Sequence, residues 1–219
     1  MPPTAVAFDL DDTLAVPTRD RRTILREAAQ VAGAPPLSRQ AYLAAHADCL
    51  TEETREPIFA ALLSDHDTSA SPAAVARAYR ELTAEALRPV PGAEPLLDRL
   101  QGTYRVGLLT NGPVVAQHDK LRELGWSGAF DAELVTGSLA AGKPDAQAFE
   151  ALLSELDTAP AETVYVGDDV HADIEGAAGV GMVPIQVLFE GSADPHPEAA
   201  AFVDRDELAT ALPGVLDEL

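Results

Sequence analysis

The stretch "AVAFDLDDTL", residues 5–14, begins as an apolar segment and then places three carboxylates within four residues. Its apolar part, Val6–Leu10, is typical of a strand that is buried on both faces of a parallel sheet. Like charges this close repel each other, so packing gives no reason for the three aspartates. The stretch therefore predicts a buried strand that ends at a functional site.

Further runs of the same short, apolar kind follow along the chain. Helical patterns lie between them, and alternating strands and helices are typical of a doubly wound sheet. We therefore predict an α/β fold with a Rossmann-like, doubly wound parallel sheet. The predicted strands after the first are Arg105–Thr110, Val164–Gly167 and Val183–Leu188, and the predicted helices between them are Glu94–Leu100, Val114–Leu124, Ala146–Leu156 and Ala172–Ala178.

The alternation breaks between about Pro17 and Arg88, where we find no convincing strand. A segment this long is too much for a simple crossover between two strands. We interpret residues 17–88 as an inserted α-helical cap domain, and residues 1–16 and 89–219 as the core domain. The alternative is that these helices cover one face of the sheet. The predicted cap helices are Arg21–Val31, Ser38–Cys49, Glu53–Leu63 and Pro72–Leu87.

Composition excludes several classes of partner. The 219 residues carry a formal net charge of −21, which repels nucleic acid polymers and anionic membranes. We find no apolar run that could span a bilayer and no secretory signal. Cys49 is the single cysteine, so a reducing, cytoplasmic location is expected.

Arginine strongly outnumbers lysine among the fifteen basic residues, since Lys120 and Lys143 are the two lysines. This composition predicts an acidic surface. One interpretation is an ordinary solvated surface, and the other is adaptation to high internal salt. A GC-rich genome would favour arginine as well, so salt adaptation stays a hypothesis.

Polar residues gather at the carboxyl ends of the first three predicted strands. In open α/β sheets, ligands bind in the crevice outside these ends. We therefore expect carboxylates, a hydroxyl and a glycine turn to meet at one edge of the sheet. The residues are Asp9, Asp11 and Asp12 after the first strand, Thr110, Asn111 and Gly112 at the second, and Asp168, Asp169 and Asp173 after the third.

This set of residue types predicts a cation and a phosphate. Carboxylate oxygens favour a hard ion, Mg²⁺ rather than zinc. The turn Thr110–Gly112 offers a hydroxyl and backbone N–H groups at the start of a helix, which is typical of a phosphate cradle. Lys143, between a glycine and a proline, would supply a compact positive charge.

Four motifs together resemble those of the haloacid dehalogenase (HAD) superfamily of hydrolases, in the subfamily with a helical cap after the first strand. They are "DLDDT" (Asp9–Thr13), "LLTNG" (Leu108–Gly112), "GKPD" (Gly142–Asp145) and "VGDDVHAD" (Val166–Asp173). The motifs cover the predicted sheet domain from end to end. The cap resembles the family in position and helicity.

The resemblance implies catalytic roles for three residues. Asp9 is the nucleophile that attacks phosphorus and becomes an aspartyl-phosphate. Asp11 protonates the leaving alcohol and then acts as base on the hydrolytic water, and a closing cap is expected to raise its pKa. Lys143 steadies Asp9 and the transferring charge. Asp12, where the family commonly has glycine, is interpreted as a solvent-facing turn residue.

The resemblance also implies the binding residues. Thr110, Asn111 and Gly112, with Lys143, would bind the phosphoryl oxygens. Mg²⁺ would be held by the carboxylates of Asp9 and Asp168 and the main-chain oxygen of Asp11. Asp173 would orient Lys143 or a metal-bound water, and Asp169 is assigned to the same outer group.

We therefore expect a Mg²⁺-dependent phosphomonoester hydrolase, a phosphatase acting on a small phosphorylated metabolite. The alternatives are a phosphomutase, a metal-independent 2-haloacid dehalogenase and a non-catalytic binding protein that kept the fold. The dehalogenase branch characteristically lacks the second aspartate, which this chain has as Asp11. The motifs specify neither the phosphomonoester, nor the cap residues that select it, nor the oligomeric state.

Overall fold

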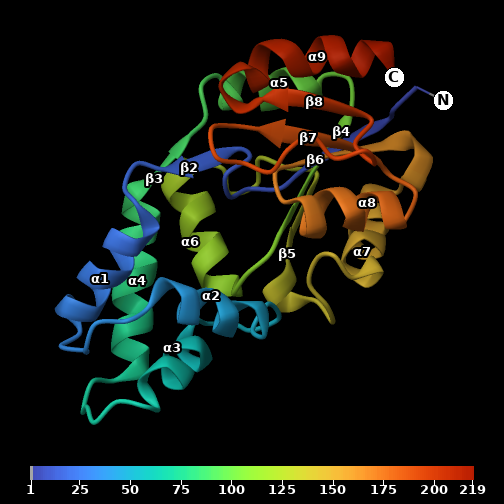
Figure 1. Ribbon diagram of the computed structural model, residues 1–219. Helices are drawn as coiled ribbons and strands as arrows, with labels where there is room; N and C mark the ends of the chain where they lie inside the picture. The colour runs from blue at the N-terminus through green and yellow to red at the C-terminus, as the bar shows by residue number, and fades with distance from the viewer. Residues whose placement is uncertain (1) are drawn as a thin grey trace.

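In the computed structural model, which describes residues 2–219, a six-stranded parallel sheet forms the centre of the molecule (Figure 1). The strand order is β5-β4-β1-β6-β7-β8, so β1 lies in the middle between β4 and β6. The strands are β1 (Ala5–Phe8), β4 (Arg105–Thr110), β5 (Ala132–Val135), β6 (Thr163–Gly167), β7 (Val183–Leu188) and β8 (Ala201–Asp204).

The sheet confirms the predicted α/β class and the four predicted strands, of which β1 is shorter than expected. All four residues of β1 are buried, as a central strand covered on both faces requires. The edge strands β5 and β8 were not predicted. Both are short and partly exposed, so neither presents the continuous apolar run that identifies a central strand.

Helices cover both faces of the sheet, which makes three layers. On one face, leucines of α5, α6 and α9 pack against Val6, Phe8 and their neighbours. On the other, Phe149 and Leu152 of α7 pack with Tyr165. The helices are α5 (Ala93–Gln101), α6 (Val114–Leu124), α7 (Ala146–Leu156), α8 (Gly176–Gly179) and α9 (Leu208–Glu218).

The segment Ala172–Ala178, which was predicted as a single α-helix, differs from that prediction. It forms a π-helical turn, Val170–Glu175, followed by α8. The wider turn is closed by a hydrogen bond from Ile174 N to Asp169 O of 3.2 Å. Such turns occur frequently at functional sites.

Four helices form a separate lobe with its own hydrophobic core, at the lower left of Figure 1. A two-stranded antiparallel ribbon of β2 (Ala15–Pro17) and β3 (Leu87–Pro89) carries the chain into this lobe and back. The ribbon lies at both ends of the predicted cap segment. The helices are α1 (Arg21–Val31), α2 (Arg39–Ala47), α3 (Glu56–Leu63) and α4 (Pro72–Ala86).

Of these cap helices, α1 has the predicted bounds, whereas α2, α3 and α4 are shorter than predicted. Ser38 caps α2 by accepting a hydrogen bond from Ala41 N. Within residues 2–219, no helix combines the length and the apolar character needed to cross a membrane.

Candidate active site

Lys143 is the centre of the site. Its Nζ lies 2.7 Å from Asp9 Oδ1, 2.6 Å from Asp173 Oδ1 and 2.9 Å from the hydroxyl of Tyr165. The hydroxyl of Tyr165 in turn donates to Leu109 O at 2.8 Å. Lys143 is 2% exposed. Burial disfavours its ammonium, but Asp173 and Asp9 hold the pKa of Lys143 well above its ordinary value, so the buried charge is paired.

Asp173 reaches Lys143 from the π-helical turn because the preceding strand ends in glycine. A Cβ on Gly167 would lie 2.4 Å from the Asp173 carboxyl group, so no other residue fits there without displacing it. The second oxygen of Asp173 accepts from Asp169 N at 3.0 Å. Asp169 is exposed and caps the turn, with Oδ1 accepting from Ala172 N at 2.8 Å. Asp173 therefore contacts Lys143 within the site, whereas Asp169 shapes the turn that holds Asp173.

Three carboxylates converge at this point. Asp9, Asp168 and Asp173 can each place one oxygen so that all three lie within 4.8 Å of one another. Burial and the nearby Asp173 and Asp11 raise the pKa of Asp9 to about 7 against the effect of Lys143. Burial and Asp9 raise the pKa of Asp168 to about 8. The crowded negative charge and the all-oxygen donor set fit a divalent hard cation.

The main-chain oxygen of Asp11 is also available to a cation, since no hydrogen bond to it is made within residues 2–219. Thr13, in the turn after β1, donates to Asp168 Oδ1 at 3.0 Å. Asp168 is thereby held in place by a side chain of the turn after β1.

Asp12 lies in the turn after β1 with φ of 65°, a backbone conformation that favours glycine. Its carboxylate pairs with Arg21 Nη2 of the cap at 2.9 Å. Asp12 is therefore a turn residue, as predicted, but it is half-buried on the cavity wall and not simply solvent-facing.

The Asp11 carboxylate points to a different set of partners. Its Oδ2 contacts Lys120 Nζ and accepts from Gln117 Nε2 at 3.1 Å. Arg21 lies 3.6 Å from the other oxygen. Burial alone raises the pKa of Asp11, but Lys120 and Arg21 outweigh burial and hold it well below its ordinary value. The prediction that a closing cap raises the pKa of Asp11 is therefore wrong for this arrangement.

Two residues of the Thr110–Gly112 turn lie on the cavity wall, and the third does not. Thr110 is buried beside Gln117, and Asn111 makes reciprocal 2.9 Å hydrogen bonds with the main chain of Lys143. Gly112 N instead donates to Thr136 Oγ1 at 3.0 Å. The amide of Gly112 is thus already paired in this arrangement.

The start of α6 binds the cap rather than offering a free phosphate cradle. Val114 N donates to Glu52 O at 3.3 Å, and Val115 N donates to Glu53 O at 3.1 Å. Thr136 Oγ1 adds a 3.0 Å bond to Leu50 O. The positive end of the helix therefore holds the cap loop against the core, which the sequence did not predict.

A cavity of about 540 Å³ lies between the two lobes, with the carboxylates and Lys143 in its wall. The cap contributes Arg21 and four residues of α2 and the loop after it. Burial and the nearby Arg55 lower the pKa of His46 to about 4, so its imidazole is neutral near pH 7. The four cavity residues from α2 and the loop after it are Leu43, His46, Ala47 and Leu50.

The sequence analysis missed Lys120, Gln117, Tyr165 and the cap residues of the cavity. One signal was present for Lys120, because it is one of two lysines in an arginine-rich chain. The rarity of lysine in this chain is also one reason why Lys143 was predicted to be functional. Gln117 and Tyr165 lie inside a regular helix and strand, where nothing in the local pattern distinguishes them from packing residues.

Comparison with known proteins gives the class of this chain. The model of the haloacid dehalogenase-like hydrolases matches residues 3–181. The match spans β1 to β6, the helical lobe and all four motifs, so the chain belongs to this family of hydrolases.

Individual relatives are named as phosphatases. The glyceraldehyde 3-phosphate phosphatase of Methanopyrus kandleri is 29% identical over 84% of this chain and 83% of its own. That of Pyrococcus furiosus is 30% identical over 65% of this chain. The ribulose-1,5-bisphosphate 5-phosphatase of Halopiger xanaduensis is 35% identical over 63% of this chain. The matches cover only 59% and 55% of the last two relatives.

Solved structures share the whole fold. The putative HAD-hydrolase YfnB of Bacillus subtilis, bound to magnesium, superposes with a TM-score of 0.74 over 99% of this chain and 100% of its own, at 22% identity. This likeness confirms the predicted α/β fold.

Proposed function

We propose that this chain is a Mg²⁺-dependent phosphomonoester hydrolase that acts through an aspartyl-phosphate on Asp9. The observation that carries the proposal is the 2.7 Å contact between Lys143 Nζ and Asp9 Oδ1 at the wall of the cavity. A buried carboxylate that faces a cavity and has its own lysine is suited to attack phosphorus, because the lysine offsets charge on both reactants.

Asp9 would be the nucleophile, and Lys143 would hold it ionised and stabilise the transferring phosphoryl charge. Asp9, Asp168 and the Asp11 main-chain oxygen would hold the Mg²⁺, which neutralises phosphoryl oxygens when bound. Thr110 and Asn111, on the cavity wall, would contact the phosphoryl group. Water would be excluded by the cap.

Asp11 would carry the proton to the leaving oxygen and later remove one from the attacking water. Here it is paired with Lys120 and Arg21 and is a carboxylate. A bound phosphate dianion would add negative charge beside it, which favours uptake of a proton. The acid role is therefore tied to an occupied cavity.

Small sugar phosphates are the substrate class that we propose. The cavity of about 540 Å³ has the size of a small-molecule site. Its cap side combines the apolar Leu43 and Leu50 with the neutral imidazole of His46, which can hydrogen-bond to a hydroxyl. The names of the relatives, which include phosphatases of glyceraldehyde 3-phosphate and ribulose 1,5-bisphosphate, support the same class.

The test is a panel of phosphomonoesters assayed with and without Mg²⁺. The panel includes triose and pentose phosphates, nucleoside monophosphates and phosphoglycolate. We expect phosphate release from a sugar phosphate with Mg²⁺ only, and its loss in Asp9→Asn. Asp217→Asn, at an exposed site on α9, is the matched control and should retain full activity. Metal-independent turnover, or full activity in Asp9→Asn, would overturn the proposal.

A phosphomutase would use the same core residues, and the panel separates the two functions. A mutase would convert one sugar phosphate into its isomer without net release of phosphate. A dehalogenase is disfavoured by the presence of both Asp11 and Asp168, which phosphoryl transfer uses and attack on carbon does not need.

A further inference from the structure

Helix α6 carries two buried polar side chains one turn apart. Gln117 is 0% exposed and Lys120 is 3% exposed. Residues three apart share a helix face, and both of these side chains reach Asp11. A buried ammonium is costly unless it is paired, so packing of the helix gives no reason for a lysine here.

Both side chains bind the same oxygen of Asp11. Lys120 Nζ and Gln117 Nε2 contact Oδ2, and Gln117 Nε2 also donates to Thr110 Oγ1 at 2.5 Å. The other oxygen, Oδ1, has the longer 3.6 Å contact with Arg21. The core therefore fixes one oxygen of Asp11, while the second lies toward the cap side of the cavity.

The two lysines of the chain differ in their partners. Lys143 contacts three acceptors, on Asp9, Asp173 and Tyr165. For Lys120, Asp11 is the one acceptor within hydrogen-bond distance in residues 2–219. Among the side chains of the site, Lys120 therefore positions Asp11 by direct contact.

We propose that Lys120 is a positioning residue, which together with Gln117 holds Oδ2 of Asp11 so that Oδ1 is aimed at the leaving group. The proposal rests on the proposed function, in which Asp11 protonates the ester oxygen. In that step a carboxylate oxygen of Asp9 forms a bond to phosphorus while the P–O bond of the ester breaks, the electron pair of the broken bond stays on the leaving oxygen, and the proton of Asp11 moves to that oxygen. A misdirected Asp11 would slow release of the leaving group only for those esters whose leaving group needs the proton, whereas its loss as a base would slow the later hydrolysis of the phosphoenzyme for every ester.

The experiment compares two esters in Lys120→Met, which keeps most of the length of the side chain and removes its charge. Glycerol phosphate releases an alkoxide that needs a proton, whereas 4-nitrophenyl phosphate releases a stable anion. We expect the single-turnover rate of leaving-group release, which precedes the step that needs a base, to fall roughly 10²-fold on glycerol phosphate, with little change on 4-nitrophenyl phosphate. The matched control is Arg122→Met, on the exposed side of the same helix, which should alter neither rate.

A second comparison covers the case in which Lys120→Met folds poorly because Asp11 is left without its partner. Asp11→Asn/Lys120→Met removes both charges, and we expect it to match Asp11→Asn alone on glycerol phosphate. Equal losses on the two esters in Lys120→Met, no loss on either, or a further loss in the double variant would overturn the inference.

The proposed function and this inference fail in different ways. Wild-type protein that hydrolyses neither ester with Mg²⁺ would refute the function and, with it, the role of Lys120. Wild-type protein that hydrolyses both, together with a Lys120→Met variant that slows leaving-group release from both equally, would refute the positioning role alone.

Discussion

Lys143 connects the stability of the core to the chemistry of the site. Lys143→Met would leave the buried carboxylates of Asp9 and Asp173 without their shared cation. Breaking one side of a buried ion pair costs about 3–5 kcal/mol, so we expect the free energy of unfolding to fall by that amount. We also expect kcat to fall by roughly 10²-fold or more.

Urea unfolding followed by circular dichroism measures the first effect, and phosphate release measures the second. Arg122→Met, which removes an exposed cation, is the control and should change neither. A Lys143→Met variant as stable and as active as the wild type would contradict the place of Lys143 at the centre of the site.

The two aspartates with raised pKa values predict how Mg²⁺ binding depends on pH. Without metal, the pKa of Asp9 is raised from 3.8 to about 7 and that of Asp168 to about 8, chiefly by burial. The folded state therefore binds more protons than the unfolded state between these values and 3.8. Their contribution to stability is present below pH 3.8 and is lost as the pH rises through 7 to 8.

Mg²⁺ must displace those protons at low pH but not at high pH. We therefore expect Mg²⁺ to raise the Tm of the metal-free protein more at pH 8 than at pH 5.5. Differential scanning calorimetry with and without Mg²⁺ measures both shifts. Asp168→Asn should reduce the shift at pH 8, and an equal shift at the two pH values in the wild type would contradict the prediction.

At the scale of elements, the helices and strands that bury a continuous apolar face were predictable from sequence. β4, β7, α6 and α7 have the predicted bounds, because each shows the period of its own structure. The edge strands β5 and β8 and the helix α9 were missed. The first two are short and half exposed, and the chain between Leu188 and α9 shows no strong periodicity.

The site was also predictable only in part. The motif residues Asp9, Lys143, Asp168 and Asp173 do converge, since strand ends in a parallel sheet meet at one edge. The docking of the cap was unpredictable, because it depends on backbone bonds from α6 to Glu52 and Glu53. Backbone N–H and carbonyl groups make these bonds largely independently of residue type, so no sequence pattern predicts them.

Helix α2 forms part of the cap side of the cavity, which predicts that it influences substrate size. Ala47 lies on the cavity wall, whereas Ala44 is exposed and outside it. We expect Ala47→Phe to fill part of the cavity and to raise KM for the sugar phosphate roughly 10-fold, in the range of one lost apolar contact. Ala44→Phe is the matched control, and an equal effect of the two substitutions would contradict the role of α2.

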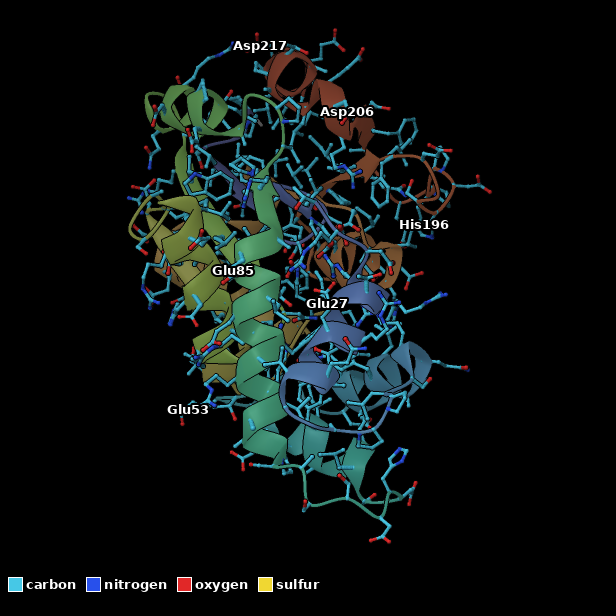
Figure 2. All side chains as sticks on the ribbon, turned by 90° about the vertical axis from the view of Figure 1, so that its left-hand side faces the viewer. Glu27, Glu53, Glu85, His196, Asp206 and Asp217 are labelled. Atoms are coloured by element: carbon cyan, nitrogen blue, oxygen red, sulfur yellow. The ribbon has the colours of Figure 1, made fainter. Side chains whose placement is uncertain are left out.

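At the scale of the whole molecule, the net charge of −21 predicts that salt stabilises the fold. Acidic side chains such as Glu53 on the cap and Asp206 and Asp217 at the far end of the core point outward (Figure 2). Screening weakens their mutual repulsion, since the Debye length falls from about 10 Å at 0.1 M salt to about 3 Å at 1 M.

We therefore expect the Tm to rise as KCl increases from about 0.1 M to about 1 M. Scanning fluorimetry at constant pH checks this, with sucrose as a control for general effects of crowded solutes. A Tm that does not rise with KCl would reject salt adaptation and leave an ordinary solvated acidic surface.

The central claim is that Asp9 accepts the phosphoryl group, and trapping that intermediate tests it most directly. The Asp11→Asn variant, which lacks the base for hydrolysis, is mixed with Mg²⁺ and 4-nitrophenyl phosphate, whose leaving group needs no proton from Asp11, and is quenched in acid. Peptide mass spectrometry should find the phosphoryl group on Asp9. A phosphoryl group on another residue, or wild-type turnover with no phosphoenzyme at all, would contradict the mechanism.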